Sequence, residues 1–303
     1  MSLGRREFFL KSVAWGAAVA AGRALRASAA EEGKAAKAEL KISSQEGIVP
    51  GKSLREKVEK MEKWGFDGLE VGGGGLPGRV KEIQEALRGT KIKLSAICSG
   101  YEGVLISEDE KVRKQAADTM KEILAAAGEL GSTGLICVPA FNGQTKLGNR
   151  EARKVLLDVL PPLGDAAVKA GTRVLLEPLN RGEAFFLRQL ADAASICRDA
   201  KNPGICMMGD FYHMNIEETC DLAAFLAAGS YLHHVHLASR ARNLPGQDER
   251  DFIAGFTGLK LIGYRDYASL ECGVVGNREV EIPKAVTFLR RQWEEADVRK
   301  ICG

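Results

Sequence analysis

Short hydrophobic runs alternate along this chain with longer segments in which apolar residues recur every three or four positions. The first pattern is typical of buried strands, and the second is typical of amphipathic helices. The helical pattern is clear at residues 54–64, 80–87 and 120–127. Eight strands are expected, at residues 40–42, 68–71, 92–97, 134–138, 173–176, 204–208, 232–237 and 268–270.

Strands and helices alternate through residues 40–303 at about 33 residues per unit, the size of a repeating strand–helix module. The alternation fits either a closed eightfold barrel or an open doubly wound sheet. The count of eight favours the barrel, and the four glycines at residues 72–75 lack the G-x-G-x-x-G spacing of a dinucleotide-binding turn. We therefore predict an α/β fold with one (β/α)8 barrel domain at residues 40–303, after a lead-in segment at residues 30–39.

The amino terminus resembles an export signal more than part of a fold. Arg5 and Arg6 precede two phenylalanines, a weakly apolar run follows at residues 13–22, and the small residues 27–29 form a cleavage site. This order is typical of a twin-arginine signal peptide, whereas the alternative is a basic, frayed terminus. The apolar run is too short to span a bilayer. We predict a signal peptide at residues 1–29, a periplasmic or otherwise exported location and no membrane span.

The net charge bears on the class of binding partner, and the spacing of the cysteines bears on their role in the fold. The formal net charge is +3, but residues 1–27 hold five basic residues and one acidic residue, so the rest of the chain is close to neutral. A nucleic-acid partner is therefore not indicated. The seven cysteines show no C-x-x-C spacing, and several lie in or beside hydrophobic runs, where we expect them to be mostly core residues.

Four consecutive expected strands end on side chains that can bind a metal ion. These residues are Glu177, Asp210, His236 and Glu271. In a barrel of parallel strands the carboxyl ends of the strands meet at one mouth, where such barrels carry their chemistry. Alone, each carboxylate could be a helix cap or a surface ion pair, and the histidine could be a core residue. Together, three carboxylates and one imidazole predict a site for one divalent ion, with Mn²⁺ favoured over Mg²⁺ or Co²⁺.

This ligand set leaves room for chemistry on a sugar. An octahedral ion with four protein ligands keeps two positions free, which two neighbouring sugar oxygens could fill. Polarising a carbonyl acidifies the adjacent C–H, as an isomerase or epimerase requires. The carboxylates beside the ion could then act as base and acid.

Two further histidines lie on the same expected strand. His234 shares the inward parity of His236, so we expect it in the barrel interior. His233 has the opposite parity and is expected to face the helices. Neither histidine is assigned a chemical role.

Several segments around these residues resemble one family of barrel enzymes. They are residues 176–183 (LEPLNRGE), residues 210–218 (DFYHMNIEE), His236 with Arg242, and Gly263-Tyr264 ahead of Glu271. The chain resembles the xylose-isomerase-like TIM barrel family of sugar and sugar-phosphate isomerases and epimerases. Within that family it is most similar to the D-tagatose and D-psicose 3-epimerases.

The resemblance implies a role for each matching residue. Glu177, Asp210, His236 and Glu271 would hold the metal ion. Glu177 and Glu271 would also be the catalytic acid/base pair, acting through a cis-enediolate. The substrate-binding residues would be Glu183, His213 and Arg242.

The chain departs from the epimerase pattern at positions that line the substrate end of the barrel mouth in that family. It has Gly182 where an aromatic residue is usual, residues 237–239 (LAS) where a polar and acidic run is usual, and Cys272-Gly273 after Glu271. The resemblance therefore leaves the identity of the sugar open, along with its phosphorylation.

The function expected from these observations is metal-dependent isomerisation or epimerisation of a keto-sugar or a sugar derivative. One alternative is a dehydratase or lyase acting on a 3-keto-glycoside with the same metal site. Another is a non-catalytic sugar-binding barrel. A DNA repair endonuclease on a related barrel is disfavoured, because its three-zinc site needs more histidines than the four present. The expected partner is a small sugar, and a homo-oligomer is compatible with the sequence.

Overall fold

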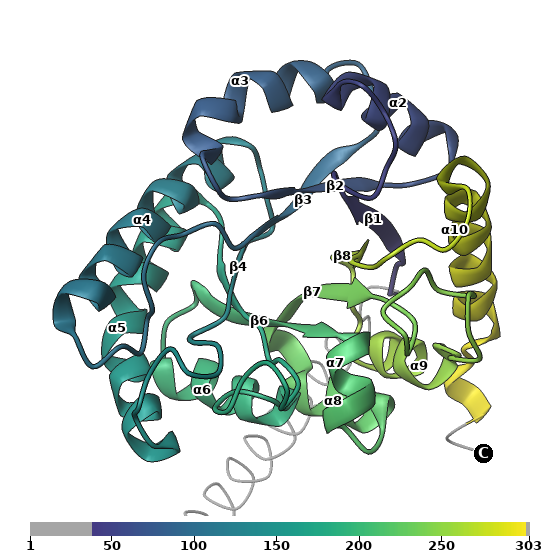
Figure 1. The fold of residues 1–303 in the computed structure, drawn as a ribbon. Coiled ribbons are helices and arrows are strands. Elements are labelled where there is room, and N and C mark those ends of the chain that lie inside the picture. The colour runs from purple at the N-terminus through teal and green to yellow at the C-terminus, as the bar shows by residue number, and fades with distance from the viewer. Residues whose placement is uncertain (1–37, 301–303) are drawn as a thin grey trace, which may run out of the picture. The chain divides into compact units, whose positions relative to one another are not determined.

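A closed barrel of eight parallel strands forms the centre of the protein in the computed structural model, which describes residues 38–300 (Figure 1). Each strand pairs with the next along the chain, and β8 closes the barrel by pairing with β1. The strands are β1 (Lys41–Gln45), β2 (Gly68–Gly72), β3 (Lys93–Cys98), β4 (Leu135–Cys137), β5 (Val174–Leu176), β6 (Ile205–Asp210), β7 (Leu232–Leu237) and β8 (Tyr267–Leu270). The prediction of a single (β/α)8 barrel is confirmed.

Helices form an outer ring around the strands (Figure 1). They are α2 (Leu54–Lys63), α3 (Leu76–Leu87), α4 (Glu110–Glu129), α5 (Asn149–Ala170), α6 (Leu190–Ala200), α7 (Phe211–Glu217), α8 (Asp221–Ala228), α9 (Ile253–Leu261) and α10 (Arg278–Glu295), with 3₁₀ turns η1 (Gly229–Tyr231) and η2 (Val298–Lys300). The predicted signal peptide at residues 1–29 lies outside the described residues, as does most of the lead-in segment.

Helix α2 shows how the sequence pattern produces a helix of the outer ring. Ser53 caps the helix, because its side-chain oxygen accepts a hydrogen bond from the backbone N–H of Glu56. Leu54, Val58 and Met61 follow at helical spacing and are all buried. The same spacing predicted this helix from the sequence.

The inside of the barrel is divided into an apolar half and a polar half. The apolar half is a buried cluster on β3 to β6, formed by Ala96, Ile136, Leu175, Cys206 and Met208. The polar half lies on β1, β2, β7 and β8, where Ser43, Glu70, His234 and Ser269 are fully buried. At least one strand neighbour of each packs into the main hydrophobic core, so alternation points these four side chains inward; these neighbours are Ile42, Leu69, Val71, Val235, Ala268 and Leu270.

Most of the described cysteines are packed in the protein. Cys137, Cys197 and Cys206 are buried, Cys98 and Cys272 are partly buried, and all of these have free thiols. The expectation that cysteines serve mainly as core residues is confirmed for these positions, whereas Cys302 lies outside the described residues.

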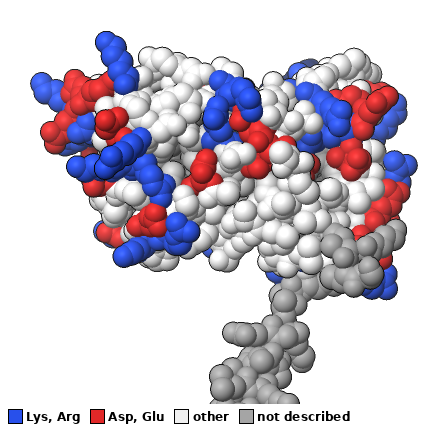
Figure 2. All heavy atoms as spheres, turned by 90° about the horizontal axis from the view of Figure 1, so that it is seen from below, with Lys and Arg blue, Asp and Glu red and all other residues white. Residues whose placement is uncertain are grey.

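The surface carries both signs of charge. On the face shown in Figure 2, basic and acidic side chains lie intermixed around a broad uncharged area. None of the helices within residues 38–300 is both long enough and apolar enough to cross a membrane.

Candidate metal and substrate site

The four predicted metal ligands meet at the carboxyl ends of β5 to β8. Glu177 directly follows β5, Asp210 is the last residue of β6, His236 lies in β7 and Glu271 directly follows β8. One ligand atom from each lies within 4.8 Å of the others. The structure therefore brings together the whole set that the sequence singled out, at the end of the barrel where chemistry is expected.

Nδ1 of His236 lies at the centre of this group. It is 3.1 Å from Oε2 of Glu271, 3.6 Å from Oε1 of Glu177 and 3.9 Å from Oδ2 of Asp210. Asp210 and His236 are fully buried and Glu177 is nearly so, while the side chain of Glu271 keeps 19% of its exposure. The cluster is therefore closed on the side of the barrel interior and open toward the mouth of the barrel at Glu271.

Two buried atoms in the cluster show that its residues fit a cation. Oδ2 of Asp210 and Nδ1 of His236 are buried and have no hydrogen-bond partner. Buried polar atoms are nearly always paired, because an unpaired one costs about 1–3 kcal/mol. A single divalent ion would bind both atoms and would offset the mutual repulsion of three carboxylates.

The same crowding spreads the pKa values of the acidic groups. Burial, together with the nearby charge of Glu271, raises the pKa of Asp210 to about 6, and burial also raises the pKa of Glu177. Although burial opposes it, the positive charges of His236 and Arg242 lower the pKa of Glu271 to about 2. The cluster without metal therefore holds protons that a cation would displace.

Two further residues contact the ligands, and the sequence analysis gave neither of them a role. The first is Glu70 in β2, which is fully buried and accepts hydrogen bonds from Nε2 of His234 at 2.8 Å and from Nε2 of His236 at 3.1 Å. A signal existed, because Glu70 stands between outward-facing Leu69 and Val71 and so points into the barrel. The interior position expected for His234 is confirmed.

The second is Gln45 at the end of β1. Its side-chain amide donates to Oε1 of Glu70 at 2.9 Å and to Oε1 of Glu271 at 2.8 Å. Only the known curvature of a barrel, which brings β1 next to β8, could have placed this residue beside Glu271. His233, by contrast, points away from the interior as expected and pairs with Asp266 at 2.7 Å.

The predicted substrate residues lie on the open side of the cluster. Nη2 of Arg242 is 2.6 Å from Oε2 of Glu271, and its guanidinium lies over the ring of Tyr212 at 4.6 Å. Asn180 connects the other two residues, because its side-chain N–H donates to Glu183 at 2.8 Å and its backbone N–H donates to Nδ1 of His213 at 3.2 Å. The structure therefore places Glu183, His213 and Arg242 in one chain of contacts that reaches the metal cluster.

The hydrogen bond to His213 fixes where that ring can donate. Nδ1 accepts from Asn180, so a neutral ring carries its hydrogen on Nε2. Burial, with the charge of Arg242, lowers the pKa of His213, which keeps the ring neutral. Nε2 lies 3.1 Å from Nη1 of Arg242, so two donors face each other at the open side of the site. A substrate oxygen beside this pair, within reach of both N–H groups, would accept from both.

The turn that carries Arg242 is held in an unusual backbone conformation. Arg242 has a φ of 56°, in the left-handed region that residues with a Cβ seldom adopt. Its carbonyl accepts a hydrogen bond of 2.7 Å from the backbone N–H of Gly273, and its own N–H donates to the carbonyl of Ser239. The loops after β7 and β8 are thereby joined, which aims the guanidinium at Glu271.

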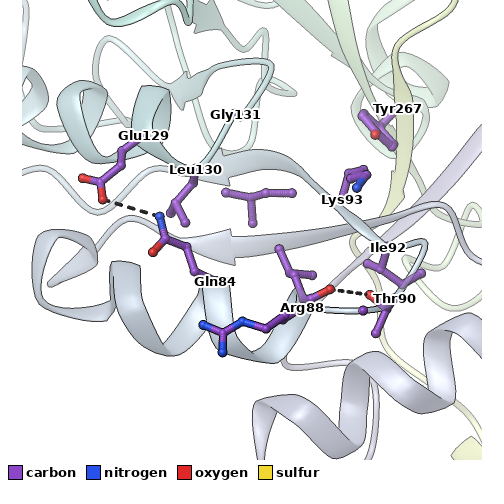
Figure 3. A pocket seen from close by; sticks show the side chains of 12 residues that line it. Gln84, Arg88, Thr90, Ile92, Lys93, Glu129, Leu130, Gly131 and Tyr267 are labelled. Atoms are coloured by element: carbon purple, nitrogen blue, oxygen red, sulfur yellow. Dashed lines mark hydrogen bonds between the residues drawn. The ribbon is translucent and has the colours of Figure 1, made fainter.

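A cavity of about 500 Å³ lies at the opposite end of the barrel (Figure 3). It is lined in part by Lys93 and Tyr267, the first residues of β3 and β8, and by Gln84 and Glu129. None of the predicted metal or substrate residues lines it. In such barrels the amino-terminal face serves stability, so we place the chemistry at the other end.

Comparison with known proteins gives a consistent result. The sequence model of the xylose isomerase-like TIM barrel family matches residues 58–292. The chain is 32% identical to 3-dehydro-D-guloside 4-epimerase of Escherichia coli K12 over 241 residues, which cover 77% of this chain and 92% of that enzyme. It is 26% identical to D-psicose 3-epimerase of Ruminiclostridium cellulolyticum, over 71% of this chain and 76% of that enzyme.

Solved structures of sugar epimerases superpose on this protein. The apo crystal structure of 3-keto-D-glucoside 4-epimerase from E. coli superposes with a TM-score of 0.78 and 29% identity, covering 84% of this chain and all of that one. D-psicose 3-epimerase of Clostridium cellulolyticum H10 with D-tagatose superposes with a TM-score of 0.77 at 21% identity, over 84% of this chain and 99% of that one, and supports the fold alone. The chain belongs to the xylose isomerase-like TIM barrel family, and its relatives support its assignment to the sugar epimerases, in the isomerase class.

Proposed function

We propose that this protein is a divalent-metal-dependent epimerase of a keto-sugar or keto-glycoside, acting at the carbon next to the carbonyl group. The observation that carries the proposal is the cluster of Glu177, Asp210, His236 and Glu271 with its two unpartnered buried atoms. A bound divalent ion would polarise the sugar carbonyl and acidify the adjacent C–H. Mn²⁺ is the ion we favour, because three carboxylates and one imidazole form a ligand set rich in oxygen.

Proton exchange is assigned to the two glutamates of the cluster. Glu177 follows β5 and Glu271 follows β8, so they approach the site from different strands of the barrel. One would remove the proton from the carbon beside the carbonyl, and the other would return a proton from its own side. Inversion at a carbon needs this arrangement of two groups, each positioned to hold a proton.

His213 and Arg242 are assigned to the sugar oxygen on which negative charge develops. Both present hydrogen-bond donors at the open side of the cluster, 3.1 Å apart. Donors that are positioned in advance stabilise such a charge without rearranging during the reaction. Glu183, held by Asn180, would bind a sugar hydroxyl.

A 3-keto-glycoside is the substrate class we favour. The E. coli 4-epimerase relative, in the sequence comparison and in the solved structure alike, is named for a 3-dehydro or 3-keto sugar, and it is more similar to this chain than the D-psicose 3-epimerase is. The chain also departs from the ketose 3-epimerase pattern at Gly182, at residues 237–239 and at Cys272-Gly273.

Incubation in D₂O tests the proposal directly. Metal-stripped protein resupplied with Mn²⁺ is mixed with 3-keto-glucosides and with free ketoses, and the products are followed by NMR. We expect inversion next to the carbonyl with deuterium incorporated there, and no turnover by the E271Q variant. Release of an aglycone or of water would indicate a lyase or dehydratase, and binding without exchange by the wild type would indicate a sugar-binding protein.

Export remains a separate proposal, since residues 1–29 lie outside the described part of the chain. Arg5 and Arg6 with the apolar run support a twin-arginine signal. In a bacterial host, fractionation should recover the shortened protein from the periplasm, and changing both arginines to lysine should leave the full-length protein in the cytoplasm. Periplasmic recovery of the double variant would contradict the proposal.

A further inference from the structure

Glu70 is a charged group that the proposed reaction leaves unused. It lies in the polar half of the barrel interior with no solvent exposure. Burying a carboxylate costs several kcal/mol unless other groups satisfy it. Here three side chains donate to it, namely Gln45, His234 and His236. Both oxygens are therefore paired, and one of the paired groups, His236, belongs to the candidate metal cluster.

Its contact with His236 determines which ring nitrogen can bind an ion. Nε2 of His236 lies 3.1 Å from both oxygens of Glu70. An ionised carboxylate only accepts hydrogen bonds, so Nε2 must carry a hydrogen. In the neutral ring Nδ1 is then left with a free lone pair, and Nδ1 is the atom that faces the three carboxylates of the cluster. Glu70 thus fixes the tautomer and the ring orientation that a metal ligand needs.

A second connection runs from Glu70 to the other side of the cluster. The amide nitrogen of Gln45 donates to Oε1 of Glu70 and to Oε1 of Glu271, at 2.9 and 2.8 Å. This contact occupies Oε1 of Glu271 and leaves Oε2 facing Nδ1 of His236 at 3.1 Å. One buried carboxylate is therefore linked to two of the four candidate ligands.

His234 completes the support from below. Its Nε2 donates to Oε2 of Glu70 at 2.8 Å, and its Nδ1 is buried without a partner. The ring therefore supplies one hydrogen bond to Glu70, and it also packs edge-on against the ring of His236, with the ring centroids 5.2 Å apart. This bond opposes rotation of the Glu70 carboxylate away from His236.

We propose that Glu70 is a positioning residue of the metal centre, which orients His236 directly and Glu271 through Gln45. The inference rests on the proposed function, because it requires an ion at the cluster above. Ligand atoms of Glu70, His234 and His236 also lie within 4.8 Å of one another, so a second ion could compete for them. Their separations of 2.8–3.1 Å are those of N–H···O hydrogen bonds, which favours positioning.

The test measures metal binding by calorimetry on chelator-stripped protein, with thermal unfolding of each metal-free variant as a check on folding. In the E70Q variant we expect one Mn²⁺ to bind about 10–100-fold more weakly than in the wild type. The Q45L variant, at a half-buried position, should bind several-fold more weakly, with a lower kcat and little change in KM. D266N is the matched control, because it removes the carboxylate charge from a His–carboxylate contact of 2.7 Å outside the interior. It should bind Mn²⁺ like the wild type.

The outcomes separate this inference from the proposed function. A wild type that binds no divalent ion overturns both. A folded E70Q protein with wild-type affinity overturns the positioning role alone, and so does a wild type that binds two ions where E70Q binds one. Should E70Q fail to fold, the Q45L result decides: weaker Mn²⁺ binding supports the role, and unchanged binding overturns it.

Discussion

The two carboxylate oxygens of Asp210 face two different parts of the protein, the start of α7 and the candidate metal cluster. Oδ1 caps α7 by accepting a hydrogen bond of 2.7 Å from the backbone N–H of Tyr212, while Oδ2 is buried and unpartnered at the metal cluster. From sequence, a helix cap and a metal ligand were competing interpretations of this residue. They are compatible because a carboxylate has two oxygens and because β6 runs directly into α7, with no loop between them.

The helix cap and the proposed metal ligation can be separated by substitution. The D210N variant keeps an oxygen for the cap but removes the charge, so we expect it to lose most of its Mn²⁺ affinity. Its metal-free form should be more stable than the wild type at pH 8 by about 1–3 kcal/mol, since the native state raises the pKa of Asp210 to about 6 and so disfavours its charged form. Because Asp210 is protonated in both states at low pH, the gain should shrink as the pH falls from 6 toward 4.

The cap is tested by comparison of D210N with D210A. Loss of the capping oxygen should make D210A less stable than D210N by about 1 kcal/mol in denaturant unfolding with chelator present. Equal stability of the two variants would show that Oδ1 contributes nothing to α7.

At the level of elements, the loop after β5 is fixed to α7 by one buried carboxylate. Glu217, whose side chain is 3% exposed, accepts hydrogen bonds from the backbone N–H of Arg181 at 2.7 Å and from its guanidinium at 2.8 Å. The loop so held carries Asn180 and Glu183, which contact each other and His213. Glu217 therefore connects the two segments in which the resemblance to the epimerases was strongest.

Loosening this connection should affect substrate binding more than chemistry. In the E217Q variant we expect KM to rise several-fold while kcat and Mn²⁺ affinity stay near the wild-type values. The reason is that Glu217 makes no contact with the four candidate metal ligands. The control is E59Q, which breaks an exposed pair between Arg55 and Glu59 on α2 and should change stability by less than about 0.5 kcal/mol. A fall in kcat with unchanged KM would argue against this role for Glu217.

Sequence patterns predicted the elements well and the contacts between distant elements poorly. All eight strands lie where hydrophobic runs indicated, because buried parallel strands need such runs. The ligands at the ends of β5 to β8 were predictable for the same reason, since strand ends converge. Glu70 and Gln45 were missed because their partners are 164 and 226 residues away in the sequence, and only closure of the barrel brings them together.

At the scale of the whole domain, the polar half of the barrel interior leads up to the metal cluster, and the apolar half supplies packing. Without an ion, the carboxylates of the cluster repel one another, which destabilises the folded protein. A bound ion should therefore stabilise the whole domain as well as the site. The amino-acid composition did not predict this effect, because the charges of the chain after residue 27 nearly cancel even though acidic residues cluster at the site.

Removing the metal should lower the thermal stability of the domain. With Mn²⁺ at about 100 times its Kd, the gain over chelator-treated protein should be about 2.7 kcal/mol, or roughly 5–10 °C in Tm at this chain length. The D210N and E271Q variants should show little or no such shift, which scanning calorimetry can measure. An equal shift in wild type and variants would mean that the ion binds elsewhere.

Anomalous diffraction from a crystal soaked in MnCl₂ would locate the proposed ion. We expect one strong Mn²⁺ peak within bonding distance of Glu177, Asp210, Glu271 and Nδ1 of His236, with Nε2 of that ring still bonded to Glu70. A cluster without a peak under saturating Mn²⁺, or a peak bound through Nε2 instead, would contradict the proposed metal site.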